Sequence, residues 1–296
     1  MYNLKNDLLN VNIKSEGAEL SAITSIKNKT EFIWQADPTI WGSHAPNLFP
    51  IIGVMKDNCY IHDGKTFTMT KHGFVRHNKT FKIKKTSETD ISFLLNSNPE
   101  LYKMYPFLFE FEISYKLTEN ILSINHKVIN VDSKPLYFSI GGHPAFNCPL
   151  YSDENYTDYS LEFEKAEHSE SHLLDNASGL VTTITKPVFT QDNTINLHSN
   201  LFNEDALIFK DLKSRKVTLT HHKKGPVLAV TFKDFPFLGI WAKPNAPYVC
   251  IEPWLGIADS ESTNQKIETK EGIIALDTGK TFNASYSIEI EKRHLV

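Results

Sequence analysis

Two histidines and an arginine lie close together in segment 71–77, which reads KHGFVRH. Gly73 follows His72 directly, and glycine allows a sharp turn of the backbone. A histidine and Arg76 on either side of a glycine–aromatic pair suit a loop that turns into a pocket. A surface or core histidine explains the segment more simply when it is taken alone.

A further histidine is held by its neighbours in segment 139–147, SIGGHPAFN. Gly141 and Gly142 permit close approach of the backbone, and Pro144 has a fixed φ that biases His143 towards an extended conformation. A histidine held this rigidly at a strand end is a better functional candidate than an isolated one. Local evidence leaves a functional and a structural role equally open.

A carboxylate ends an apolar run in segment 248–256, YVCIEPWLG. Side chains alternate between the two faces of a strand, so Tyr248, Cys250 and Glu252 share one face. Glu252 is therefore either exposed at a sheet rim or placed in a pocket where desolvation raises its pKa. The neighbouring Trp254 could stack on the apolar C–H face of a sugar or could fill the core.

Asp205 precedes the apolar run of segment 203–209, NEDALIF, where a loop or N-cap carboxylate is the default interpretation. Several common signatures are missing from the sequence. It contains no H-E-x-x-H metal motif, no G-x-S-x-G nucleophile elbow, no P-loop and no dinucleotide-binding fingerprint. The titratable residues named above are therefore the ones from which a function can be argued.

Composition narrows the class of protein further. Lysine and arginine number 31 against 35 acidic residues, a formal charge of -4 without a basic cluster, so we expect no nucleic-acid partner. No apolar stretch approaches the roughly 18 residues of a membrane span. The three cysteines are far apart in the sequence, which favours reduced thiols and a cytoplasmic protein.

The elements that must position these residues are mainly strands, because period two dominates the chain. Segment 109–117, FEFEISYKL, alternates apolar and polar residues without a break, and segment 121–131 follows after a short turn, which predicts an antiparallel hairpin. Segment 281–292 repeats the pattern. Weaker strands are expected at 11–15, 21–26, 81–85, 90–95, 161–167, 216–222, 227–232, 238–242 and 248–252.

Helical periodicity is scarce, with a turn or two expected at 98–105 and at 199–207. We therefore predict an all-β protein, a large antiparallel β-sandwich with few short helices. A chain of 296 residues could hold two domains, and the irregular stretch 152–200 could link them. We prefer long loops within one domain that spans residues 1–296.

Five short blocks in order carry a resemblance to a known family. NLFPIIG, KHGFVRH, GGHPAF, NEDALIF and WAKPNAPYVCIEPWLGIAD run from Asn47 to Asp259. Together they resemble the aldose 1-epimerase (galactose mutarotase-like) superfamily, and its LacX-type branch most of all. The resemblance implies a β-supersandwich whose open cleft holds a sugar. It also implies an isomerase that interconverts the α and β anomers of a free hexose such as galactose or glucose.

The resemblance also implies roles for particular residues. Glu252 matches the general base of the family and His143 its general acid. His72 and Asp205 match residues that contact the sugar, and Arg76 is a further contact to a hydroxyl or phosphate group. Trp254 completes the binding residues. The family uses no metal and no organic cofactor, and we expect a small-molecule sugar as partner, no membrane, and a monomer or homodimer.

Two positions depart from the family pattern. Relatives usually carry an arginine where this chain has Val54, and an acidic residue where it has His77. Lys56 or Arg76 could replace the missing guanidinium, although lysine lacks its bidentate geometry. These departures bear first on which sugar is bound.

Three alternatives stay open. A hexose-6-phosphate mutarotase would need a cationic pocket, for which Lys71, Arg76 and Lys243 are available. A glycoside-cleaving enzyme would need two carboxylates across the bond, and Glu252 with Asp205 is the available combination. A non-catalytic sugar-binding protein would use its tryptophans as stacking platforms, namely Trp41, Trp241 and Trp254.

Overall fold

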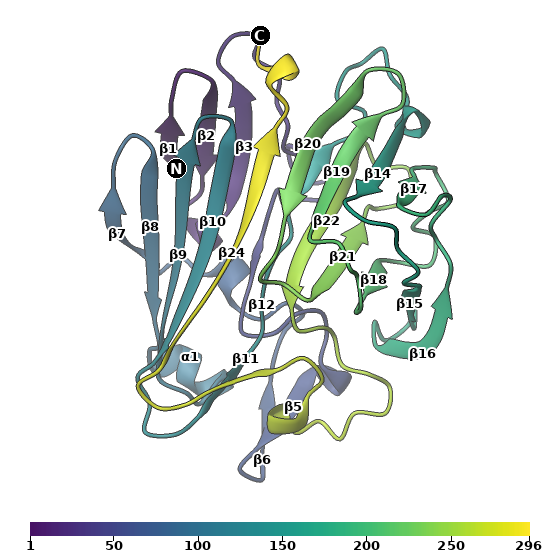
Figure 1. Ribbon diagram of the computed structural model, residues 1–296. Helices are drawn as coiled ribbons and strands as arrows, with labels where there is room; N and C mark the ends of the chain where they lie inside the picture. The colour runs from purple at the N-terminus through teal and green to yellow at the C-terminus, as the bar shows by residue number, and fades with distance from the viewer.

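The strongest sequence signal forms the centre of the largest sheet. In the computed structural model, strand β9 (Phe109–Thr118) and strand β10 (Ile121–Asn130) form an antiparallel hairpin, and strand β24 (Thr281–Ile290) pairs with the other side of β10. Buried and more exposed side chains alternate along all three strands, as period two requires. Figure 1 shows this group on the left of the molecule. The predicted hairpin and the predicted strand at 281–292 are confirmed.

The structure describes the backbone of residues 1–296 and all side chains except those of residues 85 and 86. The remaining strands are β1 (Tyr2–Lys5), β2 (Leu9–Ile13), β3 (Leu20–Ser25), β4 (Asn47–Leu48), β5 (Cys59–His62), β6 (Lys65–Thr68), β7 (Lys82–Thr86), β8 (Asp90–Asn96), β11 (Leu136–Phe138), β12 (Ile140–Gly142), β13 (Ala145–Asn147), β14 (Tyr159–Phe163), β15 (Ser171–Leu174), β16 (Val181–Lys186), β17 (Thr194–Asn196), β18 (Leu207–Phe209), β19 (Lys216–His221), β20 (Gly225–Thr231), β21 (Phe237–Trp241), β22 (Tyr248–Leu255) and β23 (Ile274–Leu276).

Two large sheets organise the molecule. One has nine strands in the order β17-β14-β19-β20-β24-β10-β9-β8-β7. The other has eight, in the order β16-β15-β18-β21-β22-β12-β4, with β13 also paired to β22. Strands β1 to β3 form a small sheet, and β11-β23 and β5-β6 form two-stranded ones. Pairings between these strands are antiparallel, so the predicted all-β antiparallel sandwich is confirmed.

The main core lies between the two large sheets. Phe49, which follows β4 in one sheet, stacks on Phe111 of β9 in the other, with ring centroids 4.4 Å apart. Phe109 and Phe138 pack against the same ring, and all four side chains are fully buried. Burial of one such aromatic side chain stabilises the fold by roughly 1.5–3 kcal/mol.

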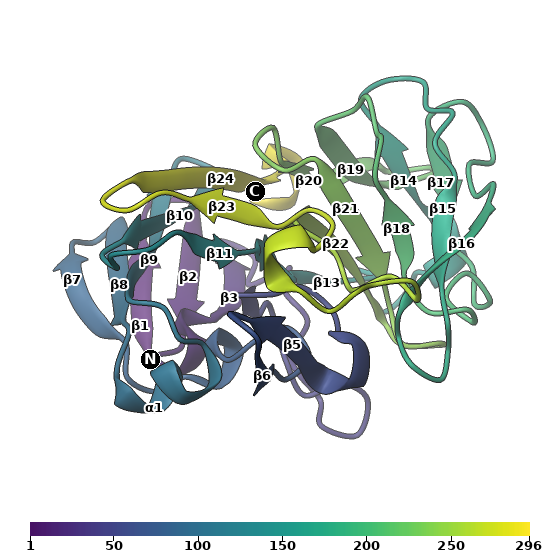
Figure 2. The ribbon, with the colours of Figure 1, turned by 90° about the horizontal axis from the view of Figure 1, so that it is seen from below.

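The α-helix α1 (Pro99–Met104) confirms one of the two predicted helical segments. The Asn98 side chain accepts hydrogen bonds from the backbone N–H groups of Glu100 and Leu101, and Pro99 occupies the first helical position. Figure 2 shows α1 with β5 and β6 on the near side of the view from below. Among the described residues, no helix has the length and apolar character of a membrane span.

The predicted helical turns at 199–207 are wrong, because the segment forms successive turns that lead into β18. Backbone bonds join residues three apart, as from the Asp205 N–H to the Phe202 carbonyl, and the φ angle of Asp205 is +69°. A left-handed residue ends a right-handed helix. Leu201 and Phe202 are buried, so packing into the core replaces helical periodicity here.

The stretch 152–200, expected to form long loops, also contains strands β14 to β17. Two of these belong to the nine-stranded sheet and two to the eight-stranded sheet. They are short and lie at or near sheet edges, where alternation of polar and apolar residues is weak. The segment therefore adds strands at one end of each of the two large sheets.

Candidate active site

A cavity opens on the face of the eight-stranded sheet and encloses about 800 Å³ of empty space, part of it open to solvent. All six residues predicted for the site line this cavity, namely His72, Arg76, His143, Asp205, Glu252 and Trp254. The structure thus brings together side chains that are separated by up to 182 positions in the chain.

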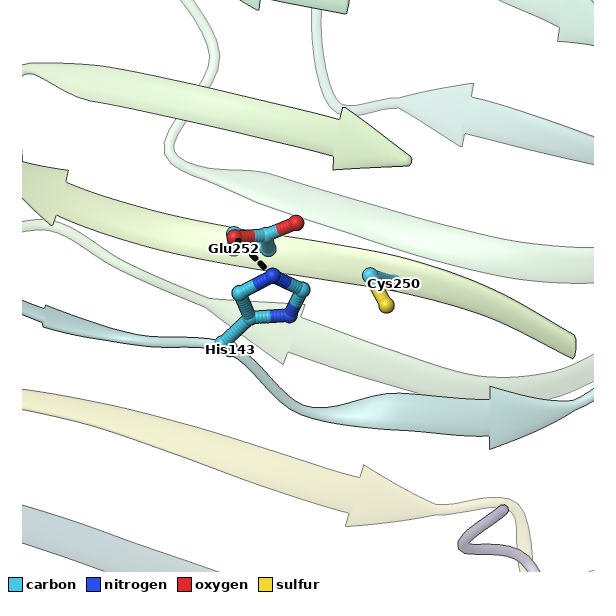
Figure 3. Close-up of side chains that lie close together, drawn as sticks. All are labelled: His143, Cys250 and Glu252. Atoms are coloured by element: carbon cyan, nitrogen blue, oxygen red, sulfur yellow. Dashed lines mark ion pairs between the residues drawn. The ribbon is translucent and has the colours of Figure 1, made fainter. Parts of the chain in front are cut away.

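Glu252 and His143 face each other across neighbouring strands. Glu252 lies on β22, and the pairings Gly141–Trp254 and Ala145–Cys250 on either side place His143 opposite it. His143 Nε2 is 3.3 Å from Glu252 Oε2, and the two side chains are 10% and 1% exposed. Figure 3 shows the imidazole directed at the carboxyl group.

Burial dominates the protonation of both groups. It raises the pKa of Glu252 well above its usual value, an effect that the positive charge of Lys71 opposes. It lowers the pKa of His143 to about 3, and the positive charge of Arg76 adds to this effect. Both shifts favour the uncharged form of each side chain.

His72 is fixed in one tautomer by the backbone. The ring Nδ1 of His72 accepts a hydrogen bond from the Gly53 N–H at 3.1 Å. The backbone N–H of His72 donates to the Gly53 carbonyl at 2.8 Å. Burial, with a contribution from His143, lowers the pKa of His72 well below its ordinary value. A neutral ring whose Nδ1 accepts must carry its proton on Nε2. His72 is therefore a hydrogen-bond donor in the cavity wall.

Backbone strain places two of the side chains in the cavity. The φ angles of His72 and Asp205 are +64° and +69°, in the left-handed region that few non-glycine residues adopt. The Asp205 Oδ1 accepts the N–H of the next residue, Ala206, at 2.7 Å, which leaves Oδ2 as an acceptor. Such conformations persist where the surrounding structure holds them, and they are concentrated at functional sites.

Two cationic side chains, Lys71 and Arg76, also line the cavity. Neither forms an ion pair among the described side chains, and the Arg76 Nε has no hydrogen-bond partner there. Burial lowers the pKa of Arg76, and the carboxylate of Glu19 opposes that shift. The cavity wall thus has positive charge available for a polar or anionic ligand.

Lys243, Lys56 and His77 do not line the cavity. The Lys243 ammonium donates to the Ile40 carbonyl at 3.0 Å and does not line this cavity. Lys56 donates to the Glu261 carbonyl at 2.8 Å, so it does not replace the guanidinium expected at Val54. His77 is exposed and lies 4.0 Å from Glu16. Arg76 alone of the two suggested substitutes reaches the cavity.

Trp41 and Trp241 pack against His143. The sequence suggested these tryptophans only as stacking platforms of a binding protein. The imidazole stacks on Trp41 with centroids 5.0 Å apart, and Trp241 meets it edge-on at 5.8 Å. Both indoles line the cavity and are half-buried. They offer the apolar surface on which the C–H face of a sugar could stack, and they fix the orientation of the imidazole.

Trp254 lies flat on the sheet because its neighbours lack side chains. A Cβ atom at Gly239 would come within 2.4 Å of its ring, and one at Gly141 within 2.9 Å. Only 5% of Trp254 is exposed, so this indole forms the floor beneath the cavity. The Trp254 Nε1 has no hydrogen-bond partner among the described residues.

The wall opposite the acid–base residues is apolar, and the sequence motifs did not predict its strand residues. Leu174 from β15 and Ile208 from β18 line the cavity together with Val54. All three belong to or pack against one small apolar cluster, separate from the main core. In the sequence they look like any other apolar strand residues, so no local signal could have identified them.

A buried ion pair holds the segment that carries Val54. The Lys270 Nζ is 2.7 Å from the Asp259 Oδ1, and both side chains are 3% exposed. The Asp259 Oδ2 accepts the Lys56 N–H at 3.0 Å, and the Asp259 N–H donates to the Val54 carbonyl at 2.9 Å. Asp259 thus contacts both Lys270 and the backbone of segment 53–56, next to the Gly53 contact with His72.

Two groups of side chains in the described part of the chain have the spacing of metal ligands. The first is His143, Cys250 and Glu252, seen together in Figure 3. Burial raises the pKa of Cys250 well above its ordinary value, and a metal needs the thiolate, so this group is a poor cation site.

The second group is His62, Asp63 and Glu268, remote from the cavity lining. The Lys134 Nζ lies 3.1 Å from the His62 Nε2 and 3.9 Å from Asp63. The Lys134 ammonium group thus already lies against two of the three side chains.

The antiparallel sandwich and the cavity on its eight-stranded sheet define a galactose mutarotase-like protein. The chain belongs to the aldose 1-epimerase family, whose model matches residues 1–276. The family and the fold that the sequence resemblance implied are therefore confirmed.

Similar proteins cover nearly the whole chain. Protein LacX, chromosomal, of Lactococcus lactis subsp. lactis is 37% identical over 300 residues, which is 97% of this chain and 98% of that protein. The crystal structure of a galactose mutarotase related enzyme from Lactobacillus acidophilus has a TM-score of 0.92 at 37% identity, covering 98% of this chain and 97% of the other. A galactose mutarotase-like protein from Lactobacillus casei ATCC 334 also reaches 0.92, at 28% identity and with 98% and 100% coverage.

Proposed function

We propose that this protein is an aldose 1-epimerase that interconverts the α and β anomers of a free hexose such as galactose or glucose. The observation that carries the proposal is the buried contact of 3.3 Å between His143 Nε2 and Glu252 Oε2 at the floor of an open cavity. Mutarotation needs a base at the anomeric hydroxyl and an acid at the ring oxygen, and a carboxyl–imidazole combination supplies both.

The reaction starts with the proton on Glu252, the form that the raised pKa of this carboxyl group favours. Transfer of that proton from Glu252 to His143 gives the carboxylate and the imidazolium. Glu252 then removes the proton of the O1 hydroxyl while His143 protonates the ring oxygen, and the C1–O5 bond breaks to give the open-chain aldehyde. Rotation about the C1–C2 bond and closure on the other face return the protons in reverse. Each such group contributes about 10²–10⁴-fold to the rate.

The other cavity residues hold the sugar in this mechanism. His72 donates a hydrogen bond through Nε2, and Asp205 accepts from hydroxyl groups through Oδ2. Arg76 is available for a further oxygen, and Trp254 lies beneath the ring. No step requires a metal or an organic cofactor.

Anomeric exchange of freshly dissolved α-galactose and α-glucose, followed by NMR at low buffer concentration, tests the proposal. We expect acceleration with the native protein and a loss of about 10²–10⁴-fold in Glu252→Gln. Glu162→Gln, at an exposed position on β14, is the matched control and should behave as native. A Glu252→Gln protein with normal turnover would refute the assignment of the base.

A hexose-6-phosphate is the second candidate substrate, favoured by Lys71 and Arg76 in the cavity wall. The same experiment with glucose-6-phosphate distinguishes the two. Faster exchange of the phosphorylated sugar, reversed in Arg76→Gln, would favour this candidate. Binding of a sugar without exchange would instead indicate a non-catalytic sugar-binding protein.

We further propose that residues 1–296 act as one domain. Strand β24 near the C-terminus lies between β10 and β20 in the same sheet, so distant parts of the chain share one sheet. We also propose a cytoplasmic location, supported by the buried free thiols of Cys148 and Cys250.

A further inference from the structure

Two enclosed polar atoms on one face of β22 lack hydrogen-bond partners. Glu252 and Trp254 are two positions apart on this strand, so both side chains project from the same face. The unpartnered atoms, among the described residues, are Oε2 of the carboxyl group and Nε1 of the indole. Buried polar atoms nearly always have partners, so an enclosed donor and an enclosed acceptor on the same strand face require an explanation.

The glycines of the two neighbouring strands fix where the indole N–H lies. A Cβ atom at Gly141 of β12 would come within 2.9 Å of the ring Cδ1, and one at Gly239 of β21 within 2.9 Å of the ring Cε2. Nε1 is bonded to both of these ring atoms, so it lies between the two outer strands, above β22.

The indole also leans along β22 towards the carboxyl group. A Cβ atom at Gly239 would come within 2.4 Å of the ring Cζ2 and within 2.5 Å of the ring Cη2. Gly239 is opposite Glu252 in the sheet, whereas Trp254 itself is opposite Phe237. The edge of the indole that carries the N–H therefore runs over β22 beside the Glu252 side chain.

Several groups act on the Glu252 carboxyl group together. Burial raises its pKa, the positive charge of Lys71 and the Trp254 N–H lower it, and the negative charge of Asp205 raises it. The titratable side chains that face Glu252 are His143, Cys250, Lys71 and Asp205. The indole N–H is a donor only, so it does not titrate with them.

We propose that Trp254 is a positioning residue for the base, whose indole N–H donates a hydrogen bond to the Glu252 carboxyl group once that group has given up its proton. A carboxylate is a stronger acceptor than a neutral carboxyl group. The terminal torsion of a glutamate side chain is broad, so the carboxyl group can turn towards the N–H at little cost. This inference rests on the proposed function, because it adds a partner for the base while His143 holds the proton.

The expected effect follows from the strength of a hydrogen bond to a charged group, which corresponds to roughly 10- to 100-fold in an equilibrium constant. Trp254→Phe keeps an aromatic ring and removes the N–H. It should raise the pKa of Glu252 by about one to two pH units. It should also lower kcat for anomeric exchange at pH 7 by roughly 10- to 100-fold, because less of the carboxylate forms. KM should change less, since phenylalanine still covers the cavity floor.

NMR of protein labelled with ¹⁵N in tryptophan and with ¹³C in the glutamate carboxyl groups tests the hydrogen bond directly. As the pH rises through the ionisation of Glu252, the Trp254 indole N–H resonance should move downfield together with the carboxyl resonance. In Glu252→Gln the N–H resonance should stay in place. Trp34 is the internal control, because its Nε1 donates to the Trp41 carbonyl at 2.9 Å and it does not line the cavity.

Phe237→Leu is the matched control for packing. Phe237 is opposite Trp254 on β21 and packs against the same small apolar cluster, but its side chain has no polar atom to lose. This variant disturbs the surroundings of the indole and leaves the N–H in place. The pKa of Glu252 should therefore stay at its native value.

An N–H resonance that follows the ionisation of Glu252, with a raised carboxyl pKa in Trp254→Phe and not in Phe237→Leu, supports the inference. An N–H resonance that stays in place while the carboxyl group ionises overturns it, as does an unchanged carboxyl pKa in Trp254→Phe. If Trp254→Phe does not fold, the titrations of the native protein and of Glu252→Gln decide. A native protein that exchanges no sugar anomers refutes the proposed function instead, and the NMR titrations still decide the inference.

Discussion

Replacing Glu252 by glutamine should stabilise the folded protein at neutral pH while lowering its activity by about 10²–10⁴-fold. The carboxyl group is 1% exposed, and Oε2 has no hydrogen-bond partner among the described residues. Folding therefore favours its protonated form, and burial raises its pKa well above the ordinary value of 4.5. Glutamine has nearly the same shape and never carries the charge.

The sign and size of the effect follow from proton linkage. The contribution of a carboxyl group with a raised folded-state pKa is fully present below pH 4.5 and is lost as the pH rises through the raised pKa. Over that range the folded state binds more protons than the unfolded state. Native stability should therefore fall by about 1.4 kcal/mol per pH unit relative to Glu252→Gln. Below pH 4.5 the two proteins should differ by a constant amount.

Urea unfolding followed by far-ultraviolet circular dichroism at each pH unit from 4 to 8 measures the difference. Glu162→Gln, whose carboxyl group is exposed on β14, is the control and should follow the native protein at every pH. A Glu252→Gln protein that is less stable than native at pH 7 would refute the reasoning. That result would mean that a charged Glu252 is stabilised by an imidazolium at His143.

Three further predictions concern pH and packing. Because burial lowers the pKa of His143 to about 3, kcat/KM should stay level between pH 7 and pH 5 in initial-rate polarimetry, whereas an ordinary imidazole would lose roughly tenfold by pH 5.5. Gly239→Ala should lower the free energy of unfolding by about 1–3 kcal/mol, because its methyl group overlaps the Trp254 ring. Asp259→Asn should cost about 3–5 kcal/mol by leaving the Lys270 ammonium buried without its carboxylate, and adding Lys270→Met should restore most of the loss.

Matched changes show what would contradict these expectations. Gly42→Ala is the control for the packing prediction, because its nearest neighbour would be 3.9 Å away, and an equal effect of both alanines would count against the overlap. A fall in kcat/KM centred near pH 6.5 would contradict the assigned state of His143. A double variant no more stable than Asp259→Asn would show that Lys270 is not the source of the cost.

The fold was predictable wherever one side of a strand faces the core. Alternation along 109–117 and 281–292 marks buried and exposed faces directly, and both became central strands. The helical turns predicted at 199–207 were wrong because the spacing of apolar residues there also suits a helix. What decides its structure is the left-handed backbone at Asp205 and the burial of Phe202, neither of which the spacing records.

The polar part of the candidate site was predictable because its residues stand beside glycine and proline, where the strand pattern breaks. The apolar part was not. Ile208 is opposite Gly239 of the next strand, and this register places it in the cavity wall. The register between strands that are distant in the chain cannot be predicted from the local sequence. Lys243 illustrates the converse, since its position next to the cavity strand β21 does not fix where its long side chain points.

Three of the four tryptophans, Trp41, Trp241 and Trp254, line the same cavity, and only Trp34 lies elsewhere. The fluorescence emission of the folded protein therefore arises largely from the walls and floor of one compartment. A sugar that enters displaces water from those indoles, so the protein reports occupancy through its own spectrum. Affinities can thus be measured by simple titration, without a label and independently of turnover.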